Sequence, residues 1–204
     1  MQTEIVKENL ELLAKAGYDM IGVDNAEEIL VVVDMQNDFT KGILGNDETK
    51  NVIPTVAKCI KEHRANGGKV IFTYDTHYAD TYMDSQEGRN LPVPHCIKGT
   101  DGWELDKNVV LALEKRGYTP VEKVTFGSVD LPALIKEASK GEEFTVELIG
   151  LCTDICVVSN ALMIKAHFPE VNVSVDEKCC AGVTVEKHIA ALETMRSCQI
   201  DVIA

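Results

Sequence analysis

Residues 29–33 read Ile29-Leu30-Val31-Val32-Val33, a continuous apolar run rich in β-branched side chains. A strand that is buried on both faces has this pattern, because neither set of alternating side chains meets water. Strands of that kind occur in parallel sheets whose two faces are covered by helices. The run therefore predicts a buried strand of an α/β fold.

Five further runs have the length and composition of strands, and stretches with helical period lie between them. The other strand candidates are residues 70–74, 120–124, 144–149, 171–175 and 200–203. Among the helix signals, Asn66-Gly67-Gly68 ends one helix, and Asp130 and Thr184 can cap two others. This alternation predicts an α/β fold with three layers (α/β/α) around a mainly parallel six-stranded sheet.

The size, charge and cysteine content of the chain limit what it can be. At 204 residues it is most simply one domain, in which residues 1–27 form an N-terminal helical extension. A net charge of −13 argues against a nucleic-acid partner, and no stretch approaches the roughly 20 consecutive apolar residues of a membrane helix. The seven cysteines lack disulfide or zinc-finger spacing, so we expect reduced thiols in a cytoplasmic protein.

Three chemically complementary side chains follow predicted strands at their carboxyl ends. Asp34 follows the first strand, Lys123 closes the third, and Cys156 lies just beyond the fourth. Ligands of parallel sheets bind at this edge, so an acid, an ammonium and a thiol would share one cleft. Each residue has an ordinary explanation alone: a cap for Asp34, a solvated side chain for Lys123 and a buried hydrophobe for Cys156. Together they could perform acyl transfer.

Cys156 stands where a predicted strand turns into a helix. Unpaired backbone N–H groups and the positive end of the helix dipole lie at such a turn. Both favour the thiolate, which is the nucleophilic form of cysteine. The sequence therefore predicts Cys156 as the nucleophile of the site.

The chain carries three motifs around these residues. They are Asp34-Met35-Gln36-Asn37-Asp38-Phe39, Lys123-Val124-Thr125-Phe126-Gly127-Ser128 and Gly150-Leu151-Cys152-Thr153-Asp154-Ile155-Cys156-Val157. In order and spacing the motifs resemble those of the isochorismatase-like cysteine hydrolases, and of the nicotinamidases in particular. The resemblance extends from about Glu28 to the C-terminus. It implies the isochorismatase-like fold, with its Rossmann-like sheet topology.

The resemblance implies that Asp34, Lys123 and Cys156 are the catalytic triad of a hydrolase. Asp34 would take the thiol proton, and the Lys123 ammonium would stabilise the thiolate that attacks an amide carbonyl. The family also has a non-proline cis peptide before the residue that matches Cys152. This peptide helps to turn the backbone N–H groups of Cys152 and Cys156 towards the oxyanion of the tetrahedral intermediate.

A second set of residues is a candidate metal site. Asp75 and His77 alternate at the end of the second predicted strand and point the same way, although a cap and a surface histidine would also explain them. His95 lies in the later segment Val93-Pro94-His95-Cys96. Nicotinamidases bind a divalent ion through residues that match Asp75, His77 and His95, and there the ion holds the pyridine nitrogen of the substrate. Two histidines and one carboxylate suit zinc, with iron and manganese as alternatives.

The chain departs from the nicotinamidase pattern at two places. Residues 78–90 lack the additional histidine that many members carry, and Pro92 stands where an aromatic residue often stacks on the pyridine ring. Phe39 matches a pocket residue of the family. Trp103 or Tyr82 could supply an aromatic wall of the substrate pocket.

These observations predict a cytoplasmic, metal-containing cysteine amidohydrolase that converts nicotinamide to nicotinate and ammonia in NAD salvage. The alternative within the family is a hydrolase of another small amide, carbamoyl compound or enol ether. The alternative outside it is a non-catalytic, ligand-binding role, since fold alone does not decide function. The expected partner is a small-molecule amide, with no nucleic acid and no membrane, and the resemblance implies a homo-oligomer.

Overall fold

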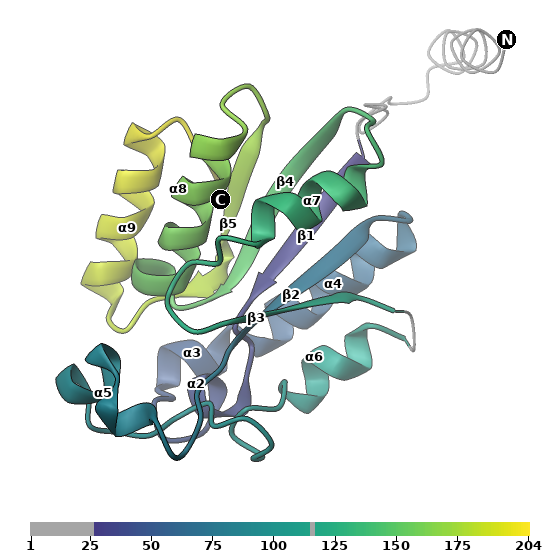
Figure 1. Cartoon of the computed structure of the whole chain (residues 1–204). Coiled ribbons are helices and arrows are strands. Elements are labelled where there is room, and N and C mark those ends of the chain that lie inside the picture. The colour runs from purple at the N-terminus through teal and green to yellow at the C-terminus, as the bar shows by residue number, and fades with distance from the viewer. Residues whose placement is uncertain (1–26, 115–116) are drawn as a thin grey trace, which may run out of the picture.

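The computed structural model describes residues 27–114 and 117–204, which form one sheet between two layers of helices (Figure 1). The strands are β1 (Glu27–Val33), β2 (Lys69–Asp75), β3 (Thr119–Lys123), β4 (Phe144–Leu151), β5 (Val173–Ala181) and β6 (Asp201–Ile203). They lie in the order β3-β2-β1-β4-β5-β6, and every neighbouring pair is parallel. The predicted α/β/α fold with a six-stranded sheet is therefore confirmed.

Two hydrophobic cores hold helices against the two faces of the sheet. On one face, Val31 and Val33 of β1 share a core with α7 (Leu131–Ser139), α8 (Val158–His167) and α9 (Val185–Ser197). On the other face, Leu30 and Val32 share a core with α4 (Ile53–Ala65) and α6 (Lys107–Ala112). Alternate side chains of β1 thus enter opposite cores, which explains why its sequence has no polar face.

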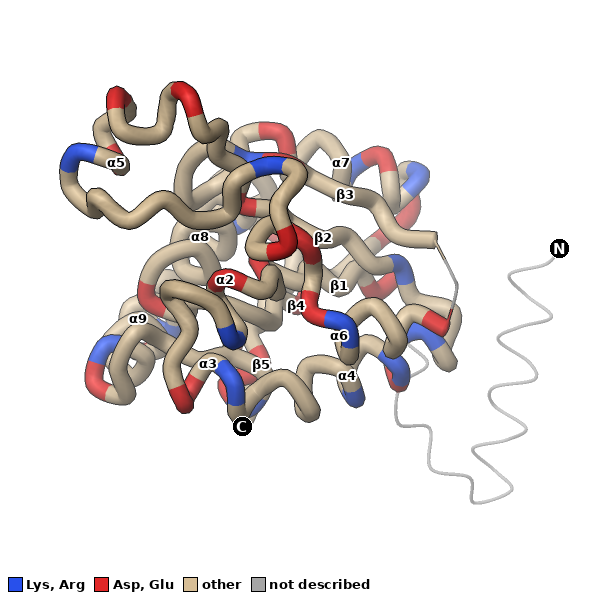
Figure 2. Tube along the Cα trace, turned by 90° about the horizontal axis from the view of Figure 1, so that it is seen from below, with Lys and Arg blue, Asp and Glu red and all other residues tan. Residues whose placement is uncertain are grey.

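Short helical turns connect the larger elements. They are α2 (Asn37–Thr40), α3 (Asp47–Asn51), η1 (Tyr82–Asp84), α5 (Gln86–Asn90) and the π-helical turn η2 (Thr153–Val157), which leads directly into α8. None of the described helices is long and apolar enough to cross a bilayer. Along the described chain, Lys and Arg positions are interspersed with Asp and Glu (Figure 2).

The structure differs from the prediction in two elements. β5 continues to Ala181, whereas its predicted end is Val175, because the charged residues 176–178 interrupt the apolar run. Asp130 precedes α7 as predicted, but its side chain makes no capping hydrogen bond, whereas Thr184 accepts one from the backbone N–H of Lys187. The predicted helical extension over residues 1–27 lies outside the described residues, except for Glu27, which begins β1.

The sheet brings two functional segments together where β1 and β4 end. Val33 pairs with Gly150, which has a φ of +115°. A Cβ at Gly150 would lie 2.1 Å from the carbonyl oxygen of Val33, so only glycine allows this approach. Because the strand order reverses between β1 and β4, a ligand site is expected outside the carboxyl ends of these two strands.

Candidate active site and metal centre

The side chains of Asp34, Lys123 and Cys156 meet at the carboxyl edge of the sheet. The Nζ atom of Lys123 lies 2.7 Å from Oδ2 of Asp34 and 3.5 Å from Sγ of Cys156. The three residues are 0%, 4% and 5% exposed, in that order. Asp34 follows β1, Lys123 ends β3, and Cys156 lies in η2 after β4. The structure thus brings together all three residues of the predicted triad.

Thr73 of β2 fixes the orientation of Asp34. The hydroxyl of Thr73 donates to Oδ1 of Asp34 at 2.6 Å and accepts from the backbone N–H of Asp34 at 3.2 Å. Asp34 has a φ of +47°, a conformation that is uncommon for non-glycine residues and that clusters at active sites. The second carboxylate oxygen, Oδ2, is thereby directed to the Lys123 ammonium.

Burial and nearby charges decide the protonation of the site. Burial raises the pKa of Cys156 well above its ordinary value; Lys123 opposes this shift, and Asp34 and Asp75 add to it. Burial alone would lower the pKa of Lys123, but the charges of Asp34, Cys156 and Asp75 raise it, so the ammonium keeps its proton. Desolvation therefore opposes the thiolate, whereas the Lys123 ammonium and the helix terminus favour it.

The turn that carries the nucleophile has the backbone features that the resemblance implies. The peptide bond between Leu151 and Cys152 is cis. The carbonyl oxygen of Cys152 accepts hydrogen bonds from the backbone N–H groups of Ile155 and Val157, each at 3.1 Å. Cys152 and Cys156 therefore belong to one closed turn, and their N–H groups stay the predicted oxyanion donors.

Three contacts that the sequence analysis missed hold this turn in place. Asn160 of α8 donates to the carbonyl oxygen of Cys156 at 2.8 Å and accepts from the backbone N–H of Ser128 at 2.9 Å. It thereby joins the nucleophile turn to the loop after β3. The hydroxyl of Thr153 lies 2.8 Å from Nδ1 of His188 on α9. The available signal for Asn160 was its spacing of one helical turn from Cys156.

The predicted metal ligands Asp75, His77 and His95 lie together, and Glu87 of α5 joins them. One ligand atom of each residue lies within 4.8 Å of the others. Oδ2 of Asp75 is 3.1 Å from Nε2 of His77 and 3.4 Å from Nε2 of His95. The same Nε2 atom of His95 is 3.5 Å from Oε1 of Glu87. The other oxygen of Asp75 lies 3.3 Å from Nζ of Lys123. One carboxylate therefore connects this cluster to the triad.

The chemistry of the cluster fits a divalent cation. Nδ1 of His95 lies 2.8 Å from the carbonyl oxygen of Val93, so this nitrogen donates to the backbone, and Nε2 is the ring nitrogen that faces Asp75 and Glu87. Although burial alone would lower the pKa of His95, hydrogen bonds to Asp75 and Glu87 raise it to about 10. The cluster thus attracts positive charge. Glu87 lies in the segment that lacks the additional histidine, where one glutamate was too common a residue to stand out.

The predicted aromatic pocket residues lie in different surroundings. The Phe39 ring packs edge-on against His95, with 5.6 Å between ring centroids, and the Tyr82 hydroxyl lies 3.2 Å from Nδ1 of His95. Trp103 donates its indole N–H to the hydroxyl of Thr76 at 2.9 Å and packs against the core beside α4 and α6. Phe39 and Tyr82 therefore border the metal cluster, whereas Trp103 supports the end of β2.

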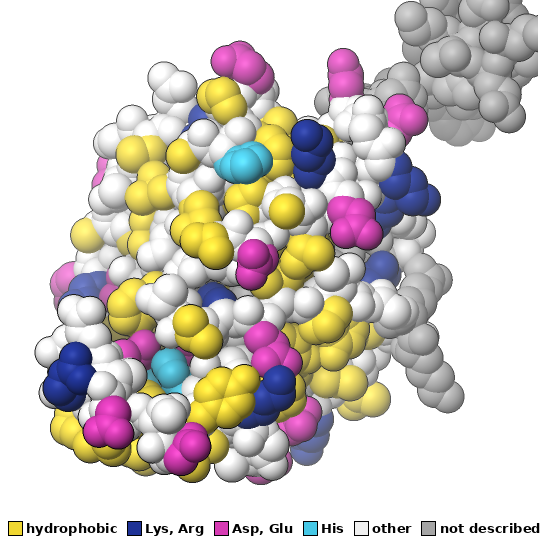
Figure 3. Space-filling model, viewed as in Figure 1, with side chains coloured by type: hydrophobic (Ala, Val, Ile, Leu, Met, Phe, Trp, Pro, Cys, Tyr) yellow, Lys and Arg dark blue, Asp and Glu magenta, His cyan; other side chains and the backbone are white. Residues whose placement is uncertain are grey.

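A cavity of about 620 Å³ opens beside the triad and the cluster. Its lining residues include His77 and Glu87 of the cluster, and Val124 and Ile155, which are chain neighbours of Lys123 and Cys156. In Figure 3 a histidine side chain is visible next to α5, among hydrophobic and acidic side chains. This cavity is therefore the candidate substrate site.

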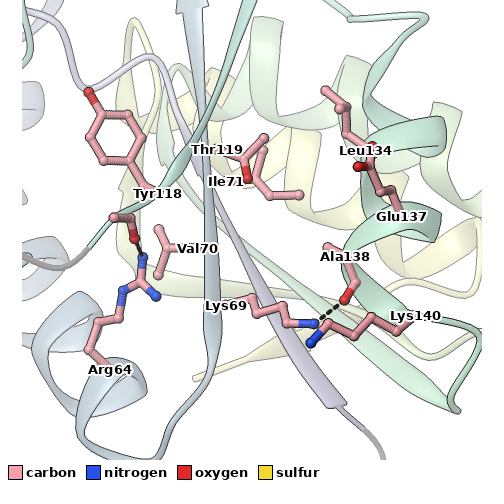
Figure 4. A pocket seen from close by; sticks show the side chains of 11 residues that line it. Arg64, Lys69, Val70, Ile71, Tyr118, Thr119, Leu134, Glu137, Ala138 and Lys140 are labelled. Carbon is pink, nitrogen blue, oxygen red and sulfur yellow. Dashed lines mark hydrogen bonds between the residues drawn. The ribbon is translucent and has the colours of Figure 1, made fainter.

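A separate cavity of about 510 Å³ lies at the opposite, amino ends of β2 and β3 (Figure 4). Arg64 donates there to the carbonyl of Gly117, and Lys69 donates to the carbonyl of Ala138. These two cations tie helices to the edge of the sheet. None of the predicted site residues lines this cavity, so we assign it no part in catalysis.

Comparison with known proteins places this geometry in a family. A family model described as the isochorismatase domain matches residues 28–204. The isochorismatase family protein PncA of Bacillus subtilis is 31% identical over 177 residues, which cover 81% of this chain and 92% of that protein. The nicotinamidase/pyrazinamidase of Mycobacterium tuberculosis is 27% identical over 192 residues, covering 85% and 97%. The crystal structure of the nicotinamidase/pyrazinamidase PncA of Bacillus subtilis matches with a TM-score of 0.75 and 26% identity, covering 87% of this chain and 100% of that one.

Proposed function

The chain belongs to the isochorismatase family, and on this basis we propose that it is a metal-containing cysteine amidohydrolase that converts nicotinamide to nicotinate and ammonia. The main support is the buried Lys123 ammonium, which contacts both the Asp34 carboxylate and the Cys156 sulfur. Hydrolysis of an amide through a thioester needs a nucleophile, a group that transfers protons and a charge that stabilises the thiolate. The relatives named nicotinamidase support the choice of substrate.

The first half-reaction forms a thioester. Asp34 takes the proton of Cys156, and the Lys123 ammonium stabilises the thiolate. The sulfur bonds to the amide carbon, and the carbonyl electron pair moves onto the oxygen. The N–H groups of Cys152 and Cys156 donate to this oxyanion, and each lowers the barrier by about 3 kcal/mol. Asp34 then protonates the amide nitrogen, the C–N bond breaks, and ammonia leaves.

The second half-reaction releases the acid. Asp34, again a carboxylate, takes a proton from water while the water oxygen bonds to the thioester carbon. The C–S bond breaks, nicotinic acid leaves and loses its carboxyl proton to water, and the Cys156 thiolate recovers its proton from Asp34. Lys123 keeps its proton throughout, because the neighbouring anions raise its pKa. One carboxylate therefore performs every proton transfer.

Asp75, His77, Glu87 and His95 would hold the divalent ion, for which we expect zinc, with iron and manganese as alternatives. When bound, the ion supplies a Lewis-acidic position for the pyridine nitrogen of the substrate. Asp75 also contacts Lys123, so a residue that would hold the ion is in direct contact with the residue that stabilises the thiolate.

Ammonia release from nicotinamide tests the proposal. We expect the wild type and a Cys180→Ala variant, which changes another buried cysteine, to release ammonia. Cys156→Ala should be slower by at least about a thousandfold, because it removes the nucleophile. Normal turnover by Cys156→Ala would exclude the thioester route. Hydrolysis of other amides but not of nicotinamide would keep the reaction class and refute the substrate.

Hydrolysis of another small amide, a carbamoyl compound or an enol ether is the second candidate. It is favoured by Pro92, which stands where the family often has the aromatic residue that stacks on the pyridine ring. A panel of such compounds, assayed for ammonia and for loss of substrate, separates the two candidates. The cytoplasmic location, the role in NAD salvage and the homo-oligomer stay predictions.

A further inference from the structure

The cavity beside the triad has a rim that the proposed reaction does not use. Four large hydrophobic side chains on it are exposed: Tyr78 (49%), Leu91 (37%), Val124 (71%) and Phe126 (43%). Exposed apolar side chains that gather around one cavity indicate a binding surface, because leaving them in water is unfavourable. The rim therefore needs an apolar occupant.

The size of the cavity also exceeds the needs of nicotinamide. Its volume of about 620 Å³ lies in the range of roughly 300–1,000 Å³ that holds drug-sized ligands. Nicotinamide is a single pyridine ring with one carboxamide. A substrate whose amide reaches Cys156 and whose ring reaches the metal cluster therefore leaves space on the side of the rim.

Residues that line the cavity are direct neighbours in the sequence of the reacting residues. Tyr78 follows the cluster residue His77, and Val124 follows Lys123. Ile155, the residue before Cys156, lines the same cavity. A substituent on the ring of a bound amide can therefore reach the rim while the amide stays at the nucleophile.

The charges around the cavity exclude an anionic substituent. Among the described residues that line it, none is Lys or Arg, and the cluster residue Glu87 contributes a carboxylate. Lys123 is already paired with Asp34 and Asp75. A carboxylate that lies at the rim, away from the metal cluster, would lose its hydration without gaining a cation, which is costly.

We propose that Tyr78, Leu91, Val124 and Phe126 form a subsite for an uncharged, apolar substituent, so that the preferred substrates are ring-alkylated aromatic carboxamides. This inference rests on the amidohydrolase function proposed above. Each CH₂ group that the rim removes from water should raise kcat/KM about fourfold. A carboxyl group at the same ring position should lower kcat/KM below that of nicotinamide.

A series of nicotinamides with ring methyl, ethyl and propyl groups, and one with a carboxyl group, tests the subsite. For the wild type we expect kcat/KM to rise with alkyl length. Phe126→Ser and Val124→Ser should flatten this dependence, because they remove apolar surface from the rim. Val129→Ser is the matched control: Val129 is 80% exposed on the same loop but does not line the cavity, so the variant should behave as the wild type.

Calorimetric binding of the same series to Cys156→Ala separates this inference from the proposed function. If affinity rises with alkyl length and depends on Phe126, while the wild type turns over no amide, the subsite is supported and the amidohydrolase is refuted. Turnover of nicotinamide with no gain from alkyl groups in affinity or in kcat/KM would overturn the subsite alone. The subsite would also be overturned if Val129→Ser flattened the dependence on alkyl length as much as Phe126→Ser does. The same holds if the carboxylated compound had a kcat/KM as high as that of the alkylated ones.

Discussion

Replacement of Lys123 by methionine would leave two buried carboxylates without their cation. Nζ of Lys123 lies 2.7 Å from Asp34 and 3.3 Å from Asp75, and the three side chains are 1%, 0% and 4% exposed. Removal of one partner from a buried ion pair costs about 3–5 kcal/mol of unfolding free energy, because the remaining charge is desolvated and unpaired. We expect Lys123→Met to lose this amount at pH 8.

The loss should depend on pH in a defined direction. Burial already raises the pKa of Asp34, and the Lys123 ammonium opposes that rise, so its removal raises this pKa further. A carboxyl whose pKa is higher in the folded than in the unfolded protein stabilises the fold at low pH and loses this contribution as pH rises. The destabilisation by Lys123→Met should therefore be largest at pH 8 and shrink towards about pH 4.

Urea unfolding followed by circular dichroism measures these differences. Lys98→Met is the matched control, because Lys98 pairs with Glu122 at 2.6 Å while both side chains are about 40% exposed, and it should lose far less stability than Lys123→Met. The double variant Lys123→Met/Asp34→Asn should recover part of the loss, since a neutral amide replaces the unpaired charge. If Lys123→Met costs no more than Lys98→Met at pH 8, the reasoning about a buried charge network is refuted.

Three further outcomes follow from individual residues. Burial and two neighbouring carboxylates raise the pKa of Glu147 to about 7, so its stabilising contribution at low pH is lost between pH 4.5 and about 7. Glu147→Gln should therefore raise the free energy of urea unfolding by about 1–2 kcal/mol at pH 8 and leave it unchanged at pH 4. An equal rise at both pH values would contradict this. His95→Ala should remove the metal from protein purified without chelator, whereas the exposed His167→Ala should keep it; unchanged metal content in His95→Ala would refute the ligand set. Gly150→Ala should lower the thermal midpoint far more than Gly141→Ala, because a Cβ at Gly150 meets the backbone at 2.1 Å whereas one at Gly141 meets no atom within 4 Å.

Strands that are buried on both faces were the easiest elements to predict. The apolar run of β1 has no polar alternation, and its residues are fully buried, as the pattern requires. The end of β5 was the hardest, because Asp176, Glu177 and Lys178 interrupt its apolar run and its pairing with β4 is irregular. An irregular strand depends on its neighbour for its hydrogen bonds, and a local pattern does not contain that neighbour.

The sequence alone determined the succession of strands and helices, and which reactive residues follow the strands. Hydrophobic period and position along the chain are local properties, so Asp34, Lys123 and Cys156 could be assigned to one edge of the sheet. Only the tertiary structure decided that Glu87 joins the metal cluster, that burial raises the pKa of Cys156, and that Phe126 and Val124 rim the cavity. These properties depend on burial and on distances between groups far apart in the chain, which exist only after folding.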